Sequence, residues 1–482
     1  MPARTLMIQG TASHAGKTVI AAALGRLFWR AGWRVAPFKA QNLSLNAVVA
    51  AGAQEGEAPG EIGWAQALQA RACGVEPTLD MNPVLLKPEP SGCQLIVRGR
   101  VAGRLPADGA GAFAPAVVAT AGEALARLRA AYDLVILEGA GSPAEINLHE
   151  RDLANRWAAE AADAPILLVG DISRGGVFAA LLGTWMLSPH PQRIAGFIIN
   201  KLHGGAASLA PGLEELERRT GVPTLGVIPW RDPELPEEDS LGLPAARRRR
   251  EANAMQVGVV RLPHIANFTD FDTLARMPGV EVFYSWDAAE LAAAEVLILP
   301  GTKSTVADLE ALRERKLDAV IQTAAARGVP VLGICGGYQM LGEEIVDREG
   351  VESARARTQG LGLLPVWTEF AAAKRTERLG GSGFGYCIHH GRIHRRGGEA
   401  LHALADGSAE GCRQARIAGT VMHGGVPETL IAQWLEWSGR ETTASPWDGV
   451  ADLDMRLERW AEHVRAHVAW ERIVARVETG AK

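Results

Sequence analysis

The sequence predicts an α/β protein of two domains, each built on a parallel sheet, and three observations support this. At 482 residues, the chain is longer than one domain of ~100–200 residues. Hydrophobic residues make up 47% and charged residues 22%, which supplies material for two cores and excludes extensive disorder. Short apolar runs alternate with helix-like segments in both halves, which is typical of parallel strands covered by helices on both faces.

The N-terminal half carries strand-like and helix-like segments in alternation. Apolar runs rich in β-branched residues predict buried strands, and a run with helical periodicity follows the first of them. The segment at 42–131 is less regular and rich in Ala, Gly and Pro, so we expect loops and helices there that shape a site. We expect strands at 5–9, 34–38, 134–137, 166–169 and 194–199, and a helix over 17–31.

A change of character at 232–253 predicts a domain boundary. An acidic stretch gives way there to a run of arginines without apolar periodicity. We interpret it as an exposed linker; a basic patch that guides a substrate is the alternative. An amphipathic pattern at 455–477 predicts a helix that closes the second domain. The second domain is expected to hold strands at 257–262, 280–284, 296–299 and 331–334. The expected divisions are a first domain at 1–235, a linker at 236–254, a second domain at 255–440 and a C-terminal helical segment at 441–482.

Charge and cysteine content restrict the partners and the compartment. Lys and Arg total 50 against 55 Asp and Glu, so a formal net charge of −5 gives no basic excess for binding nucleic acid. Five scattered cysteines form no disulfide framework, which favours a reducing compartment. Neither a secretion signal nor an apolar run of ~18 residues stands out, so we expect a cytoplasmic protein without a membrane partner. Assembly as a homo-oligomer stays open.

A glycine-containing loop, GTASHAGKT, lies between the first predicted strand and the first predicted helix. Such a loop lets backbone N–H groups approach a phosphate, and the helix N-terminus adds a favourable dipole. We therefore expect ATP to bind at Gly10, Thr11, Gly16, Lys17 and Thr18. The lysine would reach the β- and γ-phosphates, and the threonine hydroxyl would bind Mg²⁺. The spacing between the two glycines is one residue longer than in the common pattern, and a threonine stands at the usual first-glycine position.

Two acids follow predicted strands of the same sheet. Glu138 ends one strand and precedes Gly-Ala-Gly, and Asp171 ends the next strand. Open α/β sheets bind ligands at the carboxyl ends of their strands, so both acids are candidate Mg²⁺ ligands beside Thr18. An ordinary role in capping a strand end or beginning a helix is the alternative for each.

A second chemical motif, GICGG, lies between an apolar strand and a predicted helix. A cysteine on such a turn is raised out of the sheet, and its position at a helix N-terminus favours the thiolate. We therefore predict Cys335 as the nucleophile, with backbone N–H groups at Gly301 and Gly336 in the oxyanion hole. The remaining cysteines, which lack this setting, are interpreted as structural: Cys73, Cys93, Cys387 and Cys412.

A thiol nucleophile needs a base, and His423 in GTVMHG is the candidate. It lies where an apolar strand ends, and the order of strand, elbow cysteine and later histidine matches cysteine-dependent glutamine hydrolysis. Rivals are His389, His390 and His394 in CIHHGRIH, but no cysteine or acid stands at zinc-site spacing from them. We expect a solvated or packing role for these three.

Taken together, the motifs resemble those of the cobyric acid synthases, glutamine-hydrolysing amidotransferases of corrinoid biosynthesis. The resemblance covers nearly the whole chain and rests on VAPFKAQNLSLN, EGAGSPAEINL, RGGVFA, LPGTKST, GICGGYQMLG and GTVMHG. EGAG and the extended phosphate loop are shared more widely, for example with dethiobiotin synthetases and cobyrinic acid diamide synthases. The resemblance implies a P-loop domain similar to dethiobiotin synthetase, followed by an α/β domain similar to class I glutamine amidotransferases.

The resemblance also implies a reaction: ATP- and glutamine-dependent amidation of the b, d, e and g carboxylates of adenosylcobyrinic acid a,c-diamide, a corrinoid. Lys17 and Mg²⁺ would stabilise the charge during phosphoryl transfer to the carboxylate. Cys335 would attack the glutamine amide, and His423 would protonate the departing ammonia. Because ammonia is useful only while uncharged, we expect a shielded path from Cys335 to the phosphate site.

Three positions depart from the family pattern. Ser173 stands where the family usually has Asp, Cys387 where it has Glu, and Gly425 where many related glutaminases have Glu. The residue that orients the histidine is therefore unassigned, and we predict a Cys–His dyad. The alternative enzymes are cobyrinic acid a,c-diamide synthase and a related amidoligase. The non-enzymatic alternative is a ParA/MinD-like ATPase switch with an inactive glutaminase domain, against which the retained cysteine and histidine argue.

Overall fold

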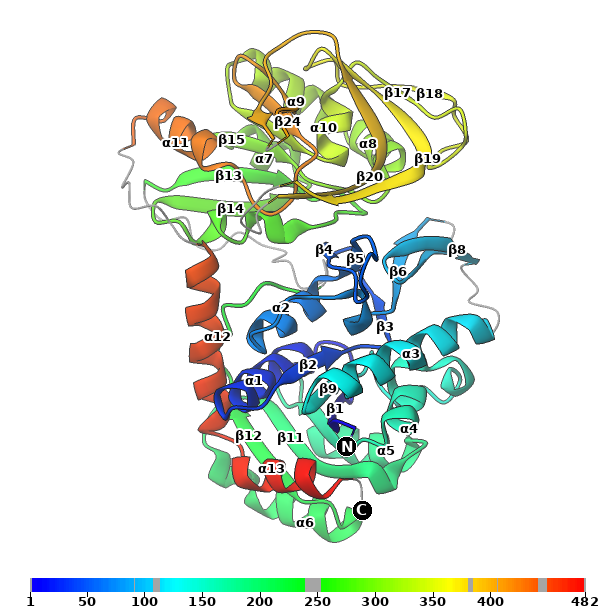
Figure 1. The fold of residues 1–482 in the computed structure, drawn as a ribbon. Helices are drawn as coiled ribbons and strands as arrows, with labels where there is room; N and C mark the ends of the chain where they lie inside the picture. Colours follow the sequence, from blue (N-terminus) through cyan, green and yellow to red (C-terminus); the bar gives the residue numbers. More distant parts are fainter. Residues whose placement is uncertain are drawn as a thin grey trace.

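Two α/β domains are stacked on each other in the computed structural model, which describes residues 2–90, 92–106, 113–238, 253–379, 385–404, 406–440 and 449–480 (Figure 1). The N-terminal domain lies in the lower part of this view and the C-terminal domain in the upper part. The two-domain α/β class predicted from the sequence is confirmed. In the part of the chain that the structure describes, no helix has both the length and the apolar character needed to cross a membrane.

The N-terminal domain is built on a parallel sheet with the strand order β12-β11-β10-β1-β9-β2. The central strand pairs in parallel with both neighbours, and separate hydrophobic cores lie on the two faces of the sheet. Burial on both faces explains why these strands are continuous apolar runs. The strands are β1 (Arg4–Gly10), β2 (Val35–Phe38), β9 (Leu134–Glu138), β10 (Ile166–Asp171), β11 (Ile194–Leu202) and β12 (Thr224–Pro229). The main helices of this half are α1 (Lys17–Arg30), α2 (Trp64–Ala72), α3 (Pro115–Ala131), α4 (Ala158–Ala162), α5 (Val177–Leu187) and α6 (Ala210–Thr220).

The segment at 42–131 contains strands that the sequence did not predict. They form a small sheet of order β3-β6-β7-β8 and a hairpin of β4 and β5, beside the expected helices. These strands are short, and the outer strand β8 is mostly exposed, so a clear hydrophobic alternation is missing. Their bounds are β3 (Gln41–Leu43), β4 (Ala47–Ala50), β5 (Gly60–Gly63), β6 (Val84–Glu89), β7 (Gly92–Val97) and β8 (Arg100–Pro106).

The C-terminal domain has a second sheet, of order β14-β13-β15-β16-β24-β23, in which all pairs are parallel except the last. A smaller sheet, β18-β17-β19-β20, packs beside it. The main strands are β13 (Met255–Val260), β14 (Val280–Ser285), β15 (Val296–Leu299), β16 (Val331–Ile334), β23 (Cys412–Gln414) and β24 (Ile417–Thr420). The smaller sheet contains β17 (Glu344–Val346), β18 (Arg357–Gln359), β19 (Val366–Arg378) and β20 (Tyr386–Arg395). The helices are α7 (Ala288–Ala292), α8 (Thr305–Glu314), α9 (Leu317–Ala326), α10 (Gly336–Leu341) and α11 (Glu428–Trp437).

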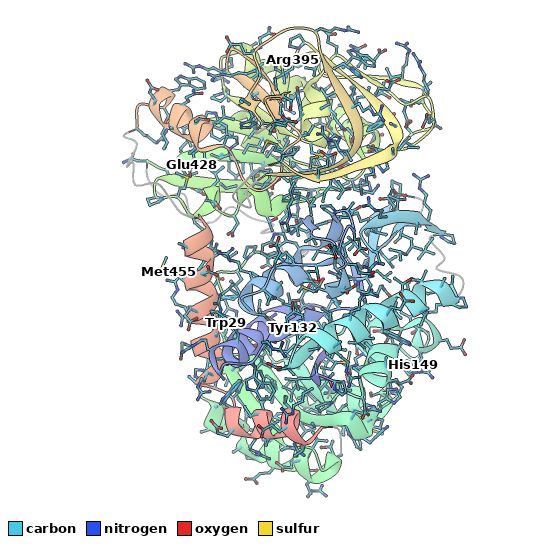
Figure 2. The ribbon with its side chains drawn as sticks, viewed as in Figure 1. Trp29, Tyr132, His149, Arg395, Glu428 and Met455 are labelled. Carbon is cyan, nitrogen blue, oxygen red and sulfur yellow. The ribbon has the colours of Figure 1, made fainter. Side chains whose placement is uncertain are left out.

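The C-terminal helices α12 (Gly449–Arg465) and α13 (Trp470–Thr479) do not close the second domain, so that expectation was wrong. Figure 1 shows them against the N-terminal domain, where α12 packs on α1. Leu457 and Trp460 share a core with Leu24, and the Trp460 indole donates to the carbonyl of Val19 at 2.9 Å. Met455, the first residue of the predicted pattern, lies on the outer side of α12 and is 58% exposed (Figure 2). Periodicity identifies an apolar face but not the surface that it covers.

A buried interface joins the two domains. Glu61 of β5 forms ion pairs with Lys87 of its own domain and Lys374 of β19. Burial alone would raise the pKa of Glu61, but the two lysine charges lower it to about 2. Around this network, Ile388 of β20 packs into an apolar cluster with residues of β4 and the neighbouring sheet. The domains therefore meet through both charged and apolar contacts. The basic run in the predicted linker lies outside the described residues.

Candidate functional site

Cys335 lies on a sharp turn between β16 and α10. Its backbone has φ 50° and ψ −106°, a conformation that a residue with a side chain rarely adopts. The Cys335 N–H donates to the carbonyl of Thr420 at 2.7 Å, which ties the turn to β24. A Cβ on Gly337 would lie only 2.0 Å from the carbonyl oxygen of Leu299. The glycine therefore lets α10 approach the sheet, and the geometry is that of a nucleophile elbow.

The structure brings Cys335 together with His423 and with Asp270, which sequence reasoning missed. The Asp270 Oδ2 lies 2.7 Å from the His423 Nδ1, and Asp270 Oδ1 accepts from the backbone N–H of Gly424 at 2.8 Å. The imidazole also lies close enough to the Cys335 side chain for the sulfur to influence its pKa. With Nδ1 bound to Asp270, the other ring nitrogen is the one available to the thiol. The geometry therefore adds a third side chain, Asp270, to the predicted Cys–His pair, in the arrangement of a triad.

Electrostatics favour a protonated imidazole at His423. Burial alone would lower the pKa of His423, but the Asp270 carboxylate and the Cys335 thiolate outweigh it and raise the pKa to about 10. A protonated imidazole beside the sulfur stabilises a thiolate, which is the nucleophilic form of cysteine. All three side chains are buried, so water screens these interactions weakly.

Asp270 lies far from the histidine in sequence, on a short 3₁₀ helix at Phe268–Phe271 that follows β13. The expected position, two residues after the histidine, is Gly425. The signal that could have found Asp270 is its place beyond the carboxyl end of a parallel strand, in the segment IANFTDFD. An aspartate that follows β13, three strands from β24 in the order of the sheet, thus takes the place beside His423 where a residue close in sequence was expected.

The two predicted oxyanion-hole glycines differ in their surroundings. Gly336 begins α10 directly after the nucleophile, which suits a backbone donor. A Cβ on Gly301 would lie 2.9 Å from the His423 Cε1, and the Gly301 carbonyl accepts from Ala266 at 2.8 Å. The requirement for glycine at 301 is thus explained by the packing of the histidine. Both oxyanion-hole assignments stay predictions.

A cavity lies at Cys335 and is lined by side chains of both charges. Lys303 and Glu352 line it from the C-terminal domain, and Leu45 lines it from the N-terminal domain. Burial raises the pKa of Glu352 to about 7, although Lys303 and backbone N–H groups lower it. A cavity with both a cation and an acid can bind the ammonium and carboxylate of an amino acid.

The three histidines of β20 lie in two different environments. His389 and His390 line the cavity, where burial lowers the pKa of each to about 4 and keeps both rings neutral. Their Nε2 atoms are buried without a protein partner. His394 lies elsewhere and stacks on Trp367 at a ring distance of 4.2 Å. The first two are therefore cavity residues, which the expected packing or solvated role did not include.

The phosphate loop links β1 to α1, as the sequence predicted. Gly10 ends β1 under the Lys17 side chain, and the Thr11 N–H donates to the carbonyl of Val169 at 2.9 Å. Gly16 has φ 103°, and a Cβ there would lie 2.2 Å from the Asn200 side-chain nitrogen. Glycine is thus required at position 16 by both conformation and space.

The side chains of Lys17 and Thr18 are hydrogen-bonded to other groups of the protein. The Lys17 ammonium donates to the carbonyls of Ala12 and Gly141, both at 2.9 Å. Burial, and then the charge of the neighbouring Lys39, lower the pKa of Lys17 to about 8. A bound phosphate would replace these carbonyls as the partner of the ammonium and raise its pKa again.

Glu138 lies beside Thr18, whereas Asp171 is engaged elsewhere. The Thr18 hydroxyl donates to Glu138 Oε1 at 2.9 Å, and the Lys39 ammonium donates to the same oxygen at 2.9 Å. Asp171 accepts from the Lys201 ammonium at 2.8 Å and from the Ser173 hydroxyl at 2.6 Å. The three predicted Mg²⁺ ligands are therefore not equivalent, and Lys39 joins the site without having been predicted.

The donor atoms at Thr18 and Glu138 fit a magnesium ion. A hydroxyl and a carboxylate are hard oxygen ligands, and Mg²⁺ is usually bound by one or two carboxylates together with substrate phosphates and water. The described residues contain no group of three or more His, Cys, Asp or Glu side chains arranged to hold a metal. Phosphate oxygens would therefore have to complete the coordination.

Comparison with known proteins finds relatives for most of the chain. A model described as the CobQ/CobB/MinD/ParA nucleotide binding domain matches residues 6–243, and a CobB/CobQ-like glutamine amidotransferase domain matches residues 256–429. A curated relative named cobyric acid synthase, from Sorangium cellulosum (strain So ce56), is 46% identical and covers 91% of this chain and 89% of its own. The chain belongs to the cobyric acid synthase family.

Further relatives agree over nearly full length. Those named cobyric acid synthase from Desulforudis audaxviator (strain MP104C) and Desulforamulus reducens (strain ATCC BAA-1160 / DSM 100696 / MI-1) are 44% and 42% identical. They cover 98% and 97% of this chain, and 99% and 96% of their own lengths. Family membership and the amidotransferase domain identify a glutamine-dependent amidoligase of cobalamin biosynthesis. The predicted family and enzyme class are thereby confirmed.

Proposed function

We propose that this protein uses ATP and glutamine to amidate the b, d, e and g carboxylates of adenosylcobyrinic acid a,c-diamide, giving adenosylcobyric acid. The observation that carries the proposal is that one chain holds both a buried Cys335–His423–Asp270 triad and a Lys17 phosphate loop. The names of the relatives supply the substrate class, a corrinoid carboxylic acid.

The glutaminase half releases ammonia by covalent catalysis. The Cys335 thiolate attacks the side-chain amide carbon of glutamine, and the His423 imidazolium gives its proton to the departing nitrogen as the C–N bond breaks. Asp270 holds the ring in place and stabilises its positive charge. Water then cleaves the thioester, which gives glutamate and regenerates the thiol. The raised pKa of His423 keeps the required proton available at neutral pH.

The nucleotide half makes the acceptor reactive. A carboxylate is a poor electrophile because oxide is a poor leaving group, and transfer of the γ-phosphoryl group gives an acyl phosphate that ammonia converts to amide and phosphate. The Lys17 and Lys39 ammonium groups stabilise the negative charge of the transferring group. When bound, Mg²⁺ would be held by Thr18 and Glu138 and would neutralise phosphate charge.

The test is a product analysis with matched substrates. The protein is incubated with ATP, glutamine and either cobyrinic acid or its a,c-diamide. The masses of the corrinoid products are then measured by mass spectrometry. The proposal expects four added amides on the a,c-diamide and one glutamate released for each. Amidation of only two carboxylates of cobyrinic acid would instead identify a cobyrinic acid a,c-diamide synthase. No glutamate release would favour the nucleotide switch with an inactive glutaminase.

A further inference from the structure

An acidic side chain from the segment between the domains reaches the phosphate loop. The Glu238 carboxylate lies 2.8 Å from the Thr18 hydroxyl, whose single proton it shares with Glu138, and it accepts from the Lys39 ammonium at 2.9 Å. Burial alone would raise the pKa of Glu238, but Lys39 and the other partners lower it to about 2, so the group is charged. Glu238 therefore holds the Lys39 ammonium that the phosphates of a bound nucleotide would need.

The backbone beside Glu238 is held by the segment that precedes β4. The Ser44 hydroxyl lies 3.3 Å from the Glu238 carbonyl, and the Asn46 amide lies 3.4 Å from the Glu237 carbonyl. The Ser44 hydroxyl also accepts from the backbone N–H of Asn46 at 3.0 Å. A movement of Glu238 would thus be transmitted to the residues at 44–46.

The residue that follows this segment, Ala47 at the start of β4, contacts the glutaminase site directly. The Ala47 N–H donates to Asn267 Oδ1 at 2.9 Å, and the Ala47 carbonyl accepts from the Tyr386 hydroxyl at 3.1 Å. Leu45, which lies between Ser44 and Asn46 in the sequence, lines the cavity at Cys335, as does Asn267. The segment therefore forms part of the wall where glutamine is expected to bind.

Both contacts of Ala47 lead to the triad within a few residues. The carbonyl of Asn267 accepts from the backbone N–H of Asp270 at 3.0 Å. The backbones of Tyr386 and His423 exchange hydrogen bonds of 3.1 and 2.8 Å, and their rings lie 5.5 Å apart. A continuous set of packed and hydrogen-bonded groups thus joins Thr18 to His423.

From this arrangement, and resting on the proposed function, we propose that Glu238 is a positioning residue that couples the nucleotide site to the glutaminase cavity. In one state Glu238 holds Thr18 and Lys39, and the segment at 44–47 closes the cavity. In the other state the phosphates of a magnesium-bound nucleotide take the Lys39 ammonium, Glu238 leaves it, and the segment moves so that glutamine enters. Such an exchange supplies the two alternative arrangements that coupling between distant sites requires.

The experiment measures glutamate release, as kcat/KM for glutamine, with and without the magnesium complex of a non-hydrolysable ATP analogue. The full chain is compared with Glu238→Ala and with a control, Glu234→Ala. Glu234 lies on the same segment but pairs with Arg459 of α12, away from the phosphate loop. Calorimetry gives the dissociation constant of the analogue for each protein.

We expect the analogue to raise kcat/KM of the wild type and of Glu234→Ala by at least about fivefold, the lower range of typical coupling. Glu238→Ala should bind the analogue more tightly, because the competing carboxylate is gone. Its glutamate release without nucleotide should be raised, and its response should fall to less than about twofold. Ser44→Ala, which leaves the contacts of Thr18 intact, should lose the response while its affinity for the analogue stays unchanged.

Three results would overturn the inference. The first is a wild type that binds the analogue and hydrolyses glutamine without any response. The second is a Glu238→Ala protein whose response equals that of the wild type. The third is a Ser44→Ala protein that keeps the full response. Absence of glutamate release from every protein, with or without nucleotide, would instead refute the proposed function itself.

Discussion

The two chemical sites of this chain differ in how complete they are without a ligand. In the C-terminal domain the triad is already assembled, with the Asp270 carboxylate 2.7 Å from His423 and the imidazole on the Cys335 side chain. In the N-terminal domain the groups that would hold phosphate are bound to the protein instead, with Lys17 on two carbonyls. A nucleophile can be set in place by the fold alone, whereas a phosphate site needs its anion to replace internal partners.

The sharpest test of this contrast is the loss of the nucleophile. Cys335→Ala should reduce glutamate release by at least ~10⁴-fold, because the covalent step disappears. Amidation with added ammonium should remain, because the phosphate loop does not depend on the thiol. Both rates can be measured on the same preparation. Cys73→Ala, which changes a buried cysteine in the N-terminal core, is the control and should retain both activities.

The orienting acid gives the next largest effect. Asp270→Asn should lower kcat for glutamate release by on the order of 10²–10⁴-fold, because the imidazolium loses the charge that stabilises it. The pKa of His423 should fall from about 10, so the pH profile of release should move to lower pH. Asp272→Asn removes a carboxylate two positions away that pairs with Arg276 and Arg456, and it should leave the profile in place. An unchanged profile in Asp270→Asn would show that the triad is not functional.

The corresponding substitution in the N-terminal domain removes the lysine of the phosphate loop. Lys17→Met should reduce ammonium-dependent amidation by about 10²–10³-fold, the usual cost of losing one group that stabilises transition-state charge. Glutamate release in the absence of nucleotide should be unchanged. A protein that amidates normally without this lysine would contradict the assignment of the phosphate loop.

The pH dependence of nucleotide affinity should be the smallest effect. Burial and Lys39 hold the pKa of free Lys17 at about 8, and bound phosphate would raise it. Binding therefore takes up a proton above pH 8, and the affinity should fall by up to about tenfold per pH unit as the pH rises beyond that value. Calorimetry in buffers of different ionisation enthalpy measures the proton uptake. Lys17→Arg, which stays charged, should remove this dependence.

The sequence was sufficient for the parts of the molecule that depend on local pattern. Buried parallel strands such as β1 and β16 are continuous apolar runs, and the motifs that follow them identified Lys17 and Cys335. Both motifs combine a strand, a turn with glycine and a helix, so the residues that indicate their chemistry are close together in the sequence.

The features that were missed are those formed between distant segments. Asp270 reaches His423 across 153 positions of sequence, and Glu238 reaches Thr18 across 220. Asp270 has only its place after β13 as a local signal, and Glu238 has none beyond its residue type, because many carboxylates in loops have a similar local sequence. The surface covered by α12 was missed for a related reason, since an amphipathic pattern does not identify its partner.

The return of α12 and α13 to the N-terminal domain has a consequence for dividing this enzyme. A cut between the domains would separate the nucleotide half from the helices that cover one face of its sheet, and would leave residues such as Leu6 and Leu24 in contact with solvent. A functional pair of separate subunits would therefore require those helices to be rejoined to the first half, as in a circular permutation. This architecture keeps both halves in one polypeptide, and hence in a fixed one-to-one ratio.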